Sequence, residues 1–325
     1  MRGFLNIDKP PGMTSFDVVR AVRRAARMKR VGHAGTLDPL ATGVLPVAVG
    51  DATRLVDELV GAPKRYRAEV LLGVETDTYD TDGEVRARVD ASAVTLEAVR
   101  AALGAFVGEV MQTPPAYSAI KRGGEPAYQA ARRGDPHEMT ARPVRVYALE
   151  ALALAPEDGD GGAVRVTLDV ACGQGFYVRS LAYDLGAALG VGGTIAALRR
   201  TQVGPFIAEE AIPLDRAVAL LESGDIEGLL QPLDAVLGHH PSARLSEDEV
   251  VRARNGLIFA LSDLAVDSLT PSSTQIRCYG PDGALVALLR PKGDPGHWHP
   301  FRVFPPDTMA ARQSGDALTR ISQLP

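Results

Sequence analysis

A short segment rich in glycine and proline, residues 32–43, constrains this chain more than any other stretch. It reads Gly-His-Ala-Gly-Thr-Leu-Asp-Pro-Leu-Ala-Thr-Gly. Glycine allows left-handed turns and proline fixes one backbone angle, so the segment predicts a tight, irregular loop. The loop carries Asp38, with His33 five residues upstream. A lone Asp-Pro pair usually marks only a turn, but here the flanking glycines favour a rigid loop that presents a carboxylate to a ligand.

Hydrophobic patterning on both sides of this loop predicts an α+β fold. Expected strands show alternating or continuous apolar residues, at 3–7, 44–49, 66–73, 144–154 and 163–171. Helical spacing is seen over residues 96–106 and 180–189, and residues 194–201 fit a strand or a short helix. Hairpins mixed with helices argue against regularly alternating strand–helix units.

Residues 14–28 predict an amphipathic helix near the N-terminus. Thr14 is the expected N-cap, and Asp17 stands at the acidic position of a capping box. Four arginines recur at helical spacing on the polar side: Arg20, Arg23, Arg24 and Arg27. No acid is expected to accompany them on this face, and two interpretations stay open: a solvated surface helix or a face that contacts phosphates.

The net charge of −5 alone would argue against a nucleic-acid partner. The distribution of charge argues the other way, because residues 1–37 carry eight Lys or Arg and only two Asp. Local sign matters more than the total for a polyanionic ligand.

Several classes of protein are disfavoured by the sequence. No apolar run is long enough for a membrane span, and the N-terminus lacks the features of a signal peptide. The two cysteines, Cys172 and Cys278, stand alone, so neither a zinc site nor a disulfide framework is expected. A cytoplasmic protein without a metal fits this pattern.

The composition changes near residues 237–241, where a second module is expected to begin. Residues 246–255 predict a helix, and residues 275–279 and 284–289 predict strands joined by a Pro-Asp-Gly turn. We therefore expect a first domain over residues 1–238, a small β-rich domain over residues 239–305 and a flexible tail over residues 306–325.

Four motifs together resemble the tRNA pseudouridine-55 synthases, the TruB-type family of pseudouridine synthases. The loop at 32–43 resembles their active-site loop, and Lys64-Arg65-Tyr66-Arg67 resembles their Lys-x-Tyr-Arg strand. Residues 172–179 and 196–200 resemble two further active-site strands. The resemblance covers about residues 3–215 and implies a pseudouridine-synthase fold with a mixed, mostly antiparallel central sheet. The C-terminal module resembles a PUA-type RNA-binding domain by position and strand pattern.

The resemblance also implies roles for individual residues. Asp38 would be the catalytic carboxylate, and Arg179 would pair with it and keep it ionised. The uracil would be held by Tyr66, Tyr177 and Leu198. His33 would enter the RNA and help to displace the target nucleotide, because a stacked base is inaccessible.

Two other segments extend the resemblance. Residues 6–12 resemble the family's Lys-Pro motif, which buttresses the active-site loop. Residues 113–135 resemble an insertion that folds over the T-arm of tRNA, where Lys121, Arg122, Arg132 and Arg133 suit phosphate contacts. Departures occur at Ala34, Tyr79, Gly173 and Phe176, where the family often has other residues, and these concern the base pocket.

A single carboxylate suits isomerisation of a uridine better than hydrolysis of a sugar, since most glycosidases use two. The detached base must stay in a largely dry pocket, rotate and bond again through C5. The implied partner is the T-arm of tRNA, with no cofactor, no membrane and no obligatory protein partner, and a monomer is expected. Two alternatives stay open: a non-catalytic tRNA-binding or tRNA-folding protein, and a relative that works with a guide RNA.

Overall fold

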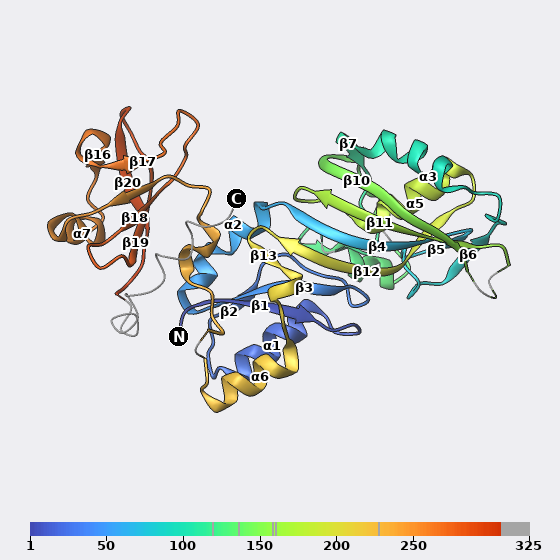
Figure 1. The fold of residues 1–325 in the computed structure, drawn as a ribbon, viewed down its shortest axis with the longest axis horizontal. Helices are drawn as coiled ribbons and strands as arrows, with labels where there is room; N and C mark the ends of the chain where they lie inside the picture. The colour runs from blue at the N-terminus through green and yellow to red at the C-terminus, as the bar shows by residue number, and fades with distance from the viewer. Residues whose placement is uncertain (119, 136, 158, 160, 227, 307–325) are drawn as a thin grey trace. The chain divides into compact units, whose positions relative to one another are not determined.

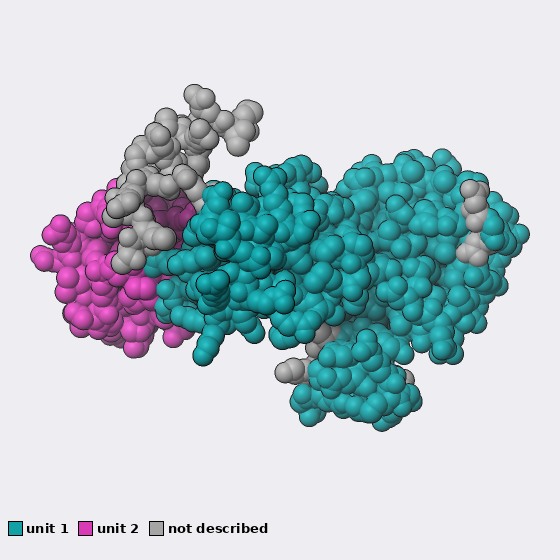
Figure 2. All heavy atoms as spheres, turned by 90° about the horizontal axis from the view of Figure 1, so that it is seen from below, with its two compact units in different colours: residues 1–231 teal, residues 232–325 magenta. Residues whose placement is uncertain are grey.

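The computed structural model describes residues 1–306 except residues 119, 136, 158, 160 and 227, and it leaves undescribed the side chains of Lys121 and Arg122. Contacts divide the chain into two compact units, residues 1–231 and 232–325 (Figure 2). The predicted tail lies outside the described residues apart from Pro306. None of the helices in the described part is both long and apolar enough to span a membrane.

The division between the units falls before the boundary expected from composition at residue 238. Gln231 belongs to the first unit, because its backbone exchanges hydrogen bonds with Phe4 in both directions. Asp234 belongs to the second, because its carboxylate accepts a hydrogen bond of 3.0 Å from the Tyr279 hydroxyl. The contact between Asp234 and Tyr279 thus assigns residues before 238 to the second unit. Composition cannot predict a contact between residues so far apart in sequence.

The first unit is built on one large sheet with the strand order β14-β1-β3-β12-β4-β11-β10-β7, to which β2 and β13 add at β3 and β12. Its strands are β1 (Gly3–Lys9), β2 (Val31–His33), β3 (Thr42–Val49), β4 (Lys64–Leu72), β7 (Gly108–Gln112), β10 (Arg142–Pro156), β11 (Val164–Cys172), β12 (Gly193–Val203), β13 (Phe206–Ile207) and β14 (Ile212–Pro213). Two pairs run parallel, β1 with β14 and β12 with β3, and the other pairs are antiparallel. The predicted mixed, mostly antiparallel sheet is confirmed.

The parallel seam between β3 and β12 joins the two halves of the sheet. It is short, with Arg199 opposite Thr42 and Arg200 opposite Gly43. The loop at 32–43 leads directly into β3 at this seam. Residues from distant parts of the sequence therefore meet at the place where the Asp38 loop enters the sheet.

Helices cover the two halves separately. They are α1 (Ser15–Ala25), α2 (Val56–Gly61), α3 (Leu96–Leu103), α4 (Ala127–Arg132), α5 (Val178–Leu189) and α6 (Leu214–Ser223). In Figure 1, α1 and α6 lie side by side against the β1–β3 half, and α3 and α5 lie against the β10–β12 half. One hydrophobic core runs through both halves of the sheet. Within it, β4 turns Ala68, Val70 and Leu72 inward, while Arg65 and Arg67 point outward.

The helix predicted over residues 14–28 has the expected start and a different end. Thr14 and Asp17 form the capping box, with Thr14 Oγ1 accepting from the Asp17 N–H at 3.1 Å. The helix stops at Ala25, because Arg27 takes a left-handed backbone with φ of 50° and Met28 N–H turns back to the Arg23 carbonyl. Arg27 therefore lies beyond the helix.

Smaller elements complete the first unit. Two hairpins pair β5 (Val74–Thr76) with β6 (Val85–Arg88) and β8 (Lys121–Arg122) with β9 (Glu125–Pro126). Short 3₁₀ turns occupy Gly50–Leu55, Gly104–Phe106 and Ala208–Glu210. The segment predicted as strand or short helix is the strand β12.

The second unit is a half-barrel-like β domain, and the predicted small β-rich domain is confirmed. Its sheet has the order β16-β20-β19-β18-β15-β17, from β15 (Ser242–Arg244), β16 (Phe259–Ala260), β17 (Val266–Asp267), β18 (Ile276–Tyr279), β19 (Leu285–Pro291) and β20 (His297–Val303). The helix α7 (Glu247–Arg254) starts with a capping box at Ser246, and 3₁₀ turns occupy Leu233–Val236 and Leu261–Asp263. Phe259, Ile276, Cys278 and Leu289 are among its buried core residues.

Candidate active site

Asp38 and Arg179 form an ion pair across 141 residues of sequence. Arg179 Nε donates to Asp38 Oδ2 at 2.9 Å. Arg179 follows the first residue of α5, and its side chain is 6% exposed, whereas that of Asp38 is 37% exposed. The cation is thus fixed inside the protein, and the carboxylate keeps an open side toward which a substrate could approach.

The remaining donors of Arg179 are also engaged. Nη1 donates to the Thr78 carbonyl at 2.8 Å, and Nη2 donates to the Tyr117 carbonyl at 2.9 Å. Asp80 Oδ2 lies 3.5 Å from Nη1. A guanidinium with fixed partners on all three nitrogens cannot rotate freely, so it orients Asp38 as well as pairing with it.

Asp80 is a member of this network that our sequence analysis did not single out. It is buried, and burial raises the pKa of its carboxyl, while a hydrogen bond from Thr78 and the charge of Arg179 act in the opposite direction. The sequence pattern singled out only Tyr79 in this segment. No sequence signal links Asp80 to Arg179, because the two residues are far apart in the chain and only the fold brings them together.

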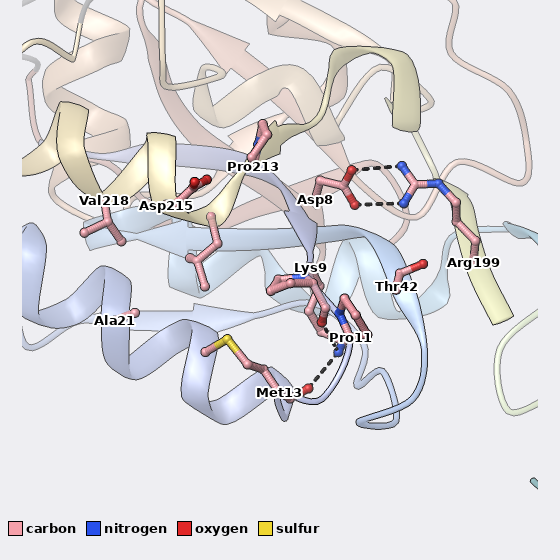
Figure 3. A pocket seen from close by; sticks show the side chains of 12 residues that line it. Asp8, Lys9, Pro11, Met13, Ala21, Thr42, Arg199, Pro213, Asp215 and Val218 are labelled. Atoms are coloured by element: carbon pink, nitrogen blue, oxygen red, sulfur yellow. Dashed lines mark hydrogen bonds and ion pairs between the residues drawn. The ribbon is translucent and has the colours of Figure 1, made fainter. Parts of the chain in front are cut away.

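Buried side chains hold the loop from behind. Lys9 is fully buried, and its Nζ donates to the carbonyls of Pro10 and Met13 (Figure 3). It also donates to the carbonyl of Pro39, the residue after Asp38. Burial lowers the pKa of Lys9 to about 8. The side chain of Ser15 binds both the N–H and the carbonyl of Leu37, the residue on the other side of Asp38.

Arg200 holds the same loop from β12. It is 1% exposed, and its guanidinium donates to the carbonyls of Val44 (2.8 Å), Gly35 (3.0 Å) and Thr36 (3.5 Å). Gly43 passes so close that a Cβ there would lie 2.2 Å from the Arg200 carbonyl oxygen. Glycine is required at Gly43, both for this approach and for its φ of 95°.

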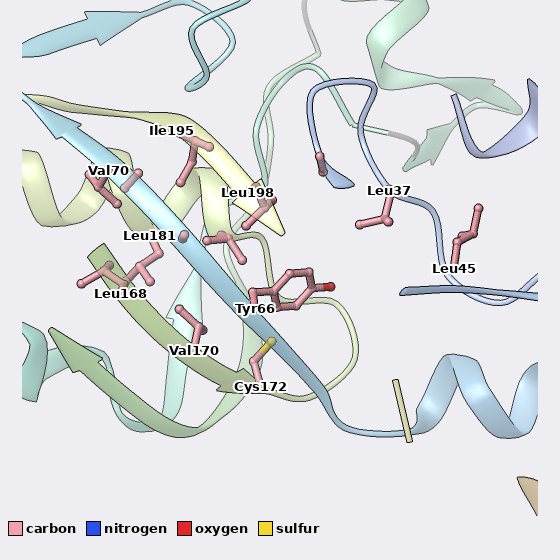
Figure 4. Close-up of a cluster of buried hydrophobic side chains, with 14 of the residues drawn as sticks. Leu37, Leu45, Tyr66, Val70, Leu168, Val170, Cys172, Leu181, Ile195 and Leu198 are labelled. Atoms are coloured by element: carbon pink, nitrogen blue, oxygen red, sulfur yellow. The ribbon is translucent and has the colours of Figure 1, made fainter. Parts of the chain in front are cut away.

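Tyr66 and Leu198 form an apolar wall. Tyr66 is 9% and Leu198 8% exposed, and both belong to the main core. Figure 4 shows the Tyr66 ring extending from β4, with Leu198 on one side and Cys172 on the other. Burial raises the pKa of the Tyr66 phenol, so the hydroxyl keeps its proton at neutral pH. Cys172 and Cys278 are both buried free thiols.

Tyr177 lies at the start of α5, two residues before Arg179. The side chain of Gln112 fixes its backbone, donating to the Tyr177 carbonyl at 3.0 Å and accepting from its N–H at 2.8 Å. The guanidinium of Arg142 lies over the ring at 5.5 Å. The ring is half-buried and is not part of the Tyr66 cluster.

His33 ends β2 and is half-buried. Burial and the nearby charge of Arg200 lower the pKa of its imidazole. The ring is therefore neutral at pH 7. Its Nδ1 is buried without a hydrogen-bond partner among the described residues.

The four arginines expected to form one polar face do not do so. Arg20 is paired with Asp17 at 2.6 Å, so an acid does accompany this face. Arg23 is half-buried and donates to the Val31 carbonyl at 3.1 Å, which ties α1 to β2. Arg24 and Arg27 are exposed, and Arg27 lies past the helix.

The cations of the insertion are described in part. Arg132 is exposed, with its guanidinium 5.6 Å from the Tyr128 ring centroid. Arg133 is engaged with both carboxylate oxygens of Glu125. The side chains of Lys121 and Arg122 lie outside what the structure describes, so their predicted contacts stay predictions.

Two cavities of about 560 Å³ each flank the Lys9 turn and share Pro11, Thr42 and Arg199. One lies between α1 and α6 (Figure 3). Leu198 and Leu40 line the other. Asp38 does not line either of these two cavities.

Comparisons with known proteins place the chain in a family. The model of the TruB family pseudouridylate synthase N-terminal domain matches residues 23–178, and that of the tRNA pseudouridylate synthase B C-terminal domain matches residues 179–238. Proteins named tRNA pseudouridine synthase B are similar along nearly the whole chain. Those of Dehalococcoides mccartyi (strain ATCC BAA-2266 / KCTC 15142 / 195) and Arthrobacter sp. (strain FB24) are 40% and 42% identical, each covering 94% of this chain and 97% of the relative.

Solved structures also match. The chain resembles a protein in the crystal structure of a Cbf5-Nop10-Gar1 complex, with 29% identity, a TM-score of 0.70, and coverage of 94% of this chain and 85% of the other. A structure of an H/ACA RNP bound to a substrate RNA containing 2'-deoxyuridine matches at 27% identity, a TM-score of 0.69 and the same coverage. From the matched models and the relatives, this chain belongs to the TruB family of tRNA pseudouridine synthases, which are isomerases.

Proposed function

We propose that this chain converts the T-loop uridine of tRNA, position 55, to pseudouridine, with Asp38 as the acting carboxylate. The observation that carries the proposal is the pairing of a partly open Asp38 with a buried Arg179 that has partners on every nitrogen. A carboxylate held in that way is paired with a cation, oriented and accessible, which is what attack on or stabilisation of a ribosyl centre needs.

The overall reaction balances within the nucleotide. The bond between the ribose C1′ and uracil N1 breaks, a bond from C1′ to C5 forms, and the hydrogen of C5 is replaced by one on N1. No atom enters or leaves overall, so the reaction as proposed needs no cofactor. Three routes use this same carboxylate: a bond to the sugar, a bond to the uracil ring, or removal of a sugar proton.

The neighbouring residues suit the other requirements. Tyr66 and Leu198 offer apolar surface for a flipped uracil, and base–aromatic stacking contributes about 1–3 kcal/mol. Burial keeps the Tyr66 phenol protonated, so if Tyr66 takes the C5 proton it must release its own proton in the same step. His33, neutral and at the edge of the same loop, is the candidate for displacing the target nucleotide.

The decisive experiment incubates the isolated chain with an unmodified tRNA transcript and maps modified bases. Asp38→Asn should bind the transcript as well as the parent and give no product. Asp51→Asn is the matched control, because the Asp51 carboxylate also forms an ion pair, at 3.1 Å with the exposed Arg30. Product from a clean Asp38→Asn preparation would refute the proposal.

The same experiment separates the two alternatives. A tRNA-folding function would survive Asp38→Asn, and it can coexist with catalysis in one chain. A guide-RNA mechanism would leave the isolated chain inactive on bare tRNA. The higher identity to proteins named tRNA pseudouridine synthase B, 40–42%, than to the chains of the Cbf5 and H/ACA structures, 27–29%, favours direct action on tRNA.

A further inference from the structure

An unusual backbone angle lies directly beside the Arg179 network. Tyr79 has φ of +63°, in the left-handed region that non-glycine residues seldom adopt. Its two chain neighbours both face Arg179: the Thr78 carbonyl accepts from Nη1 at 2.8 Å, and the Asp80 carboxylate lies 3.5 Å from the same nitrogen. The reversed backbone at Tyr79 allows Thr78 and Asp80, on either side of it, to present two acceptors to one guanidinium.

Main-chain contacts fix the ends of this reversal. The Ile195 N–H donates to the Tyr79 carbonyl at 3.0 Å, and the Thr81 N–H donates to the Ile195 carbonyl at 2.9 Å. Thr76 Oγ1 donates to the Asp80 carbonyl at 2.7 Å. Strained backbone of this kind persists only where its surroundings over-determine it, and it concentrates at functional sites.

The side chain of Tyr79 provides a further constraint. Its ring stacks on that of Tyr183 with centroids 4.3 Å apart and an interplanar angle of 19°. Tyr183 lies four residues after Arg179 on α5, so both side chains leave the same face of that helix. One helix therefore presents a cation to the neighbours of Tyr79 and an aromatic ring to Tyr79 itself.

We propose that the Tyr79–Tyr183 stack is a positioning device for the reaction. It holds the reversed backbone at Tyr79, which keeps Thr78 and Asp80 on Arg179 and so fixes the direction of Asp38. This inference rests on the proposed role of Asp38. Neither tyrosine contacts the reacting atoms under the proposal, so both are positioning residues and not catalytic ones.

The 78–80 backbone can affect the direction of Asp38 because one cation, Arg179, binds several acceptors at once. Arg179 serves the carbonyls of Thr78 and Tyr117 and the carboxylates of Asp38 and Asp80. If the 78–80 backbone relaxed, Nη1 would lose its partners and the guanidinium could turn, carrying Nε away from Asp38. Small displacements of a reacting group lower rates steeply, by up to about 10²-fold for 1 Å.

The test measures single-turnover rates and tRNA affinity on an unmodified transcript. Tyr183→Leu, which keeps an apolar group without the ring, should lower the rate about tenfold and leave affinity within about twofold. Tyr183→Phe keeps the ring and should restore the rate. Tyr79→Gly, which accepts a positive φ without strain, should lower the rate like Tyr183→Leu and provides the test if the leucine variant does not fold.

A double-mutant cycle with Asp80→Asn separates positioning from general destabilisation. If the stack acts through the Arg179 network, Tyr183→Leu should change the rate by less than about twofold once Asp80 is replaced. An equal rate loss in both backgrounds, an unchanged rate, or a loss confined to tRNA affinity would each overturn the inference. Product from Asp38→Asn would instead overturn the proposed function, so the two failures are distinguishable.

Discussion

The active-site loop (residues 32–43) and the insertion (residues 113–135) both approach Arg179, but they are held in different ways. The loop is fixed by side chains from three distant elements, Lys9 of β1, Ser15 of α1 and Arg200 of β12. At its start the insertion has long-range contacts: the Tyr117 carbonyl accepts from Arg179, the Thr113 carbonyl accepts from Ser180, and the Tyr117 hydroxyl donates to Asp77. After residue 117 its described hydrogen bonds are local, such as Tyr128 N–H to the Ser118 carbonyl and Arg133 to Glu125.

The difference corresponds to what each segment has to do. A carboxylate that reacts must be held within fractions of an ångström, and long-range contacts from buried groups provide that. Cations that meet phosphates can act through long, adaptable side chains, so local support is sufficient. Changes in the loop's supports should therefore alter the rate, and changes in the insertion should alter affinity.

Loss of the Arg179 guanidinium should have the largest effect among the supports. Arg179→Met should lower the single-turnover rate by about 10²-fold or more, because Asp38 loses its charge partner and its orientation. Arg179→Lys should recover only part of the rate, since one ammonium cannot serve four separated acceptors. Arg67→Met is the control, because Arg67 is half-exposed and forms its ion pair with Asp169. Comparable losses of single-turnover rate in Arg67→Met and Arg179→Met would contradict a special role for the buried arginine.

Arg200 and Arg199 offer a matched pair of neighbours. Arg200→Met removes a donor from two loop carbonyls, Gly35 and Thr36, and from the Val44 carbonyl of β3. We expect a loss of about 1–3 kcal/mol in unfolding free energy, with a reduced rate. Arg199→Met removes a pair with Asp8 that is about a third exposed, for which about 0–1 kcal/mol is expected. Chemical denaturation of both variants measures the difference. Equal stabilities would show that the loop does not depend on its buried cation.

Arg132 and Arg133 provide the same comparison inside the insertion. Arg132→Ala should weaken tRNA binding and lower the slope of log affinity against log salt by about 1, with the single-turnover rate at saturation unchanged. Arg133→Ala should change the slope less, because Arg133 is already neutralised by Glu125. Titrations at several salt concentrations decide this. A slower chemical step in Arg132→Ala would contradict the expectation that the insertion affects affinity and not the rate.

The smallest expected effect is a pH dependence from His33. Burial lowers the pKa of its imidazole below 6.5, so on acidification the unfolded chain takes up a proton before the folded chain does. The free energy of unfolding should therefore fall as pH drops from 6.5 toward the lowered pKa. Thermal melts between neutral and mildly acidic pH should show a smaller loss for His33→Gln than for the parent. Identical pH profiles of stability for His33→Gln and the parent would show that burial of His33 does not contribute to the pH dependence.

The two predicted arginine sites show where sequence reasoning succeeds and where it does not. Arg179 was expected beside Asp38 because its motif matched a family pattern, and the 2.9 Å contact is present. The α1 arginines were interpreted from helical spacing alone, and the structure gives Arg20 an acid and Arg23 a structural carbonyl. Spacing gives the face of a helix, but the partners on that face come from the rest of the fold.

Sequence by itself determined the local features of this protein. Glycine and proline made residues 32–43 a loop, alternation made β4 a strand, and Thr14 with Asp17 started α1, since each depends on neighbours along the chain. Only the tertiary structure decided that Asp80 and Tyr117 would join Asp38 at Arg179, and that Arg200 would be buried behind the loop. Those contacts depend on sheet register and on the β3–β12 seam, which bring together residues separated by more than a hundred positions, beyond the reach of any local pattern.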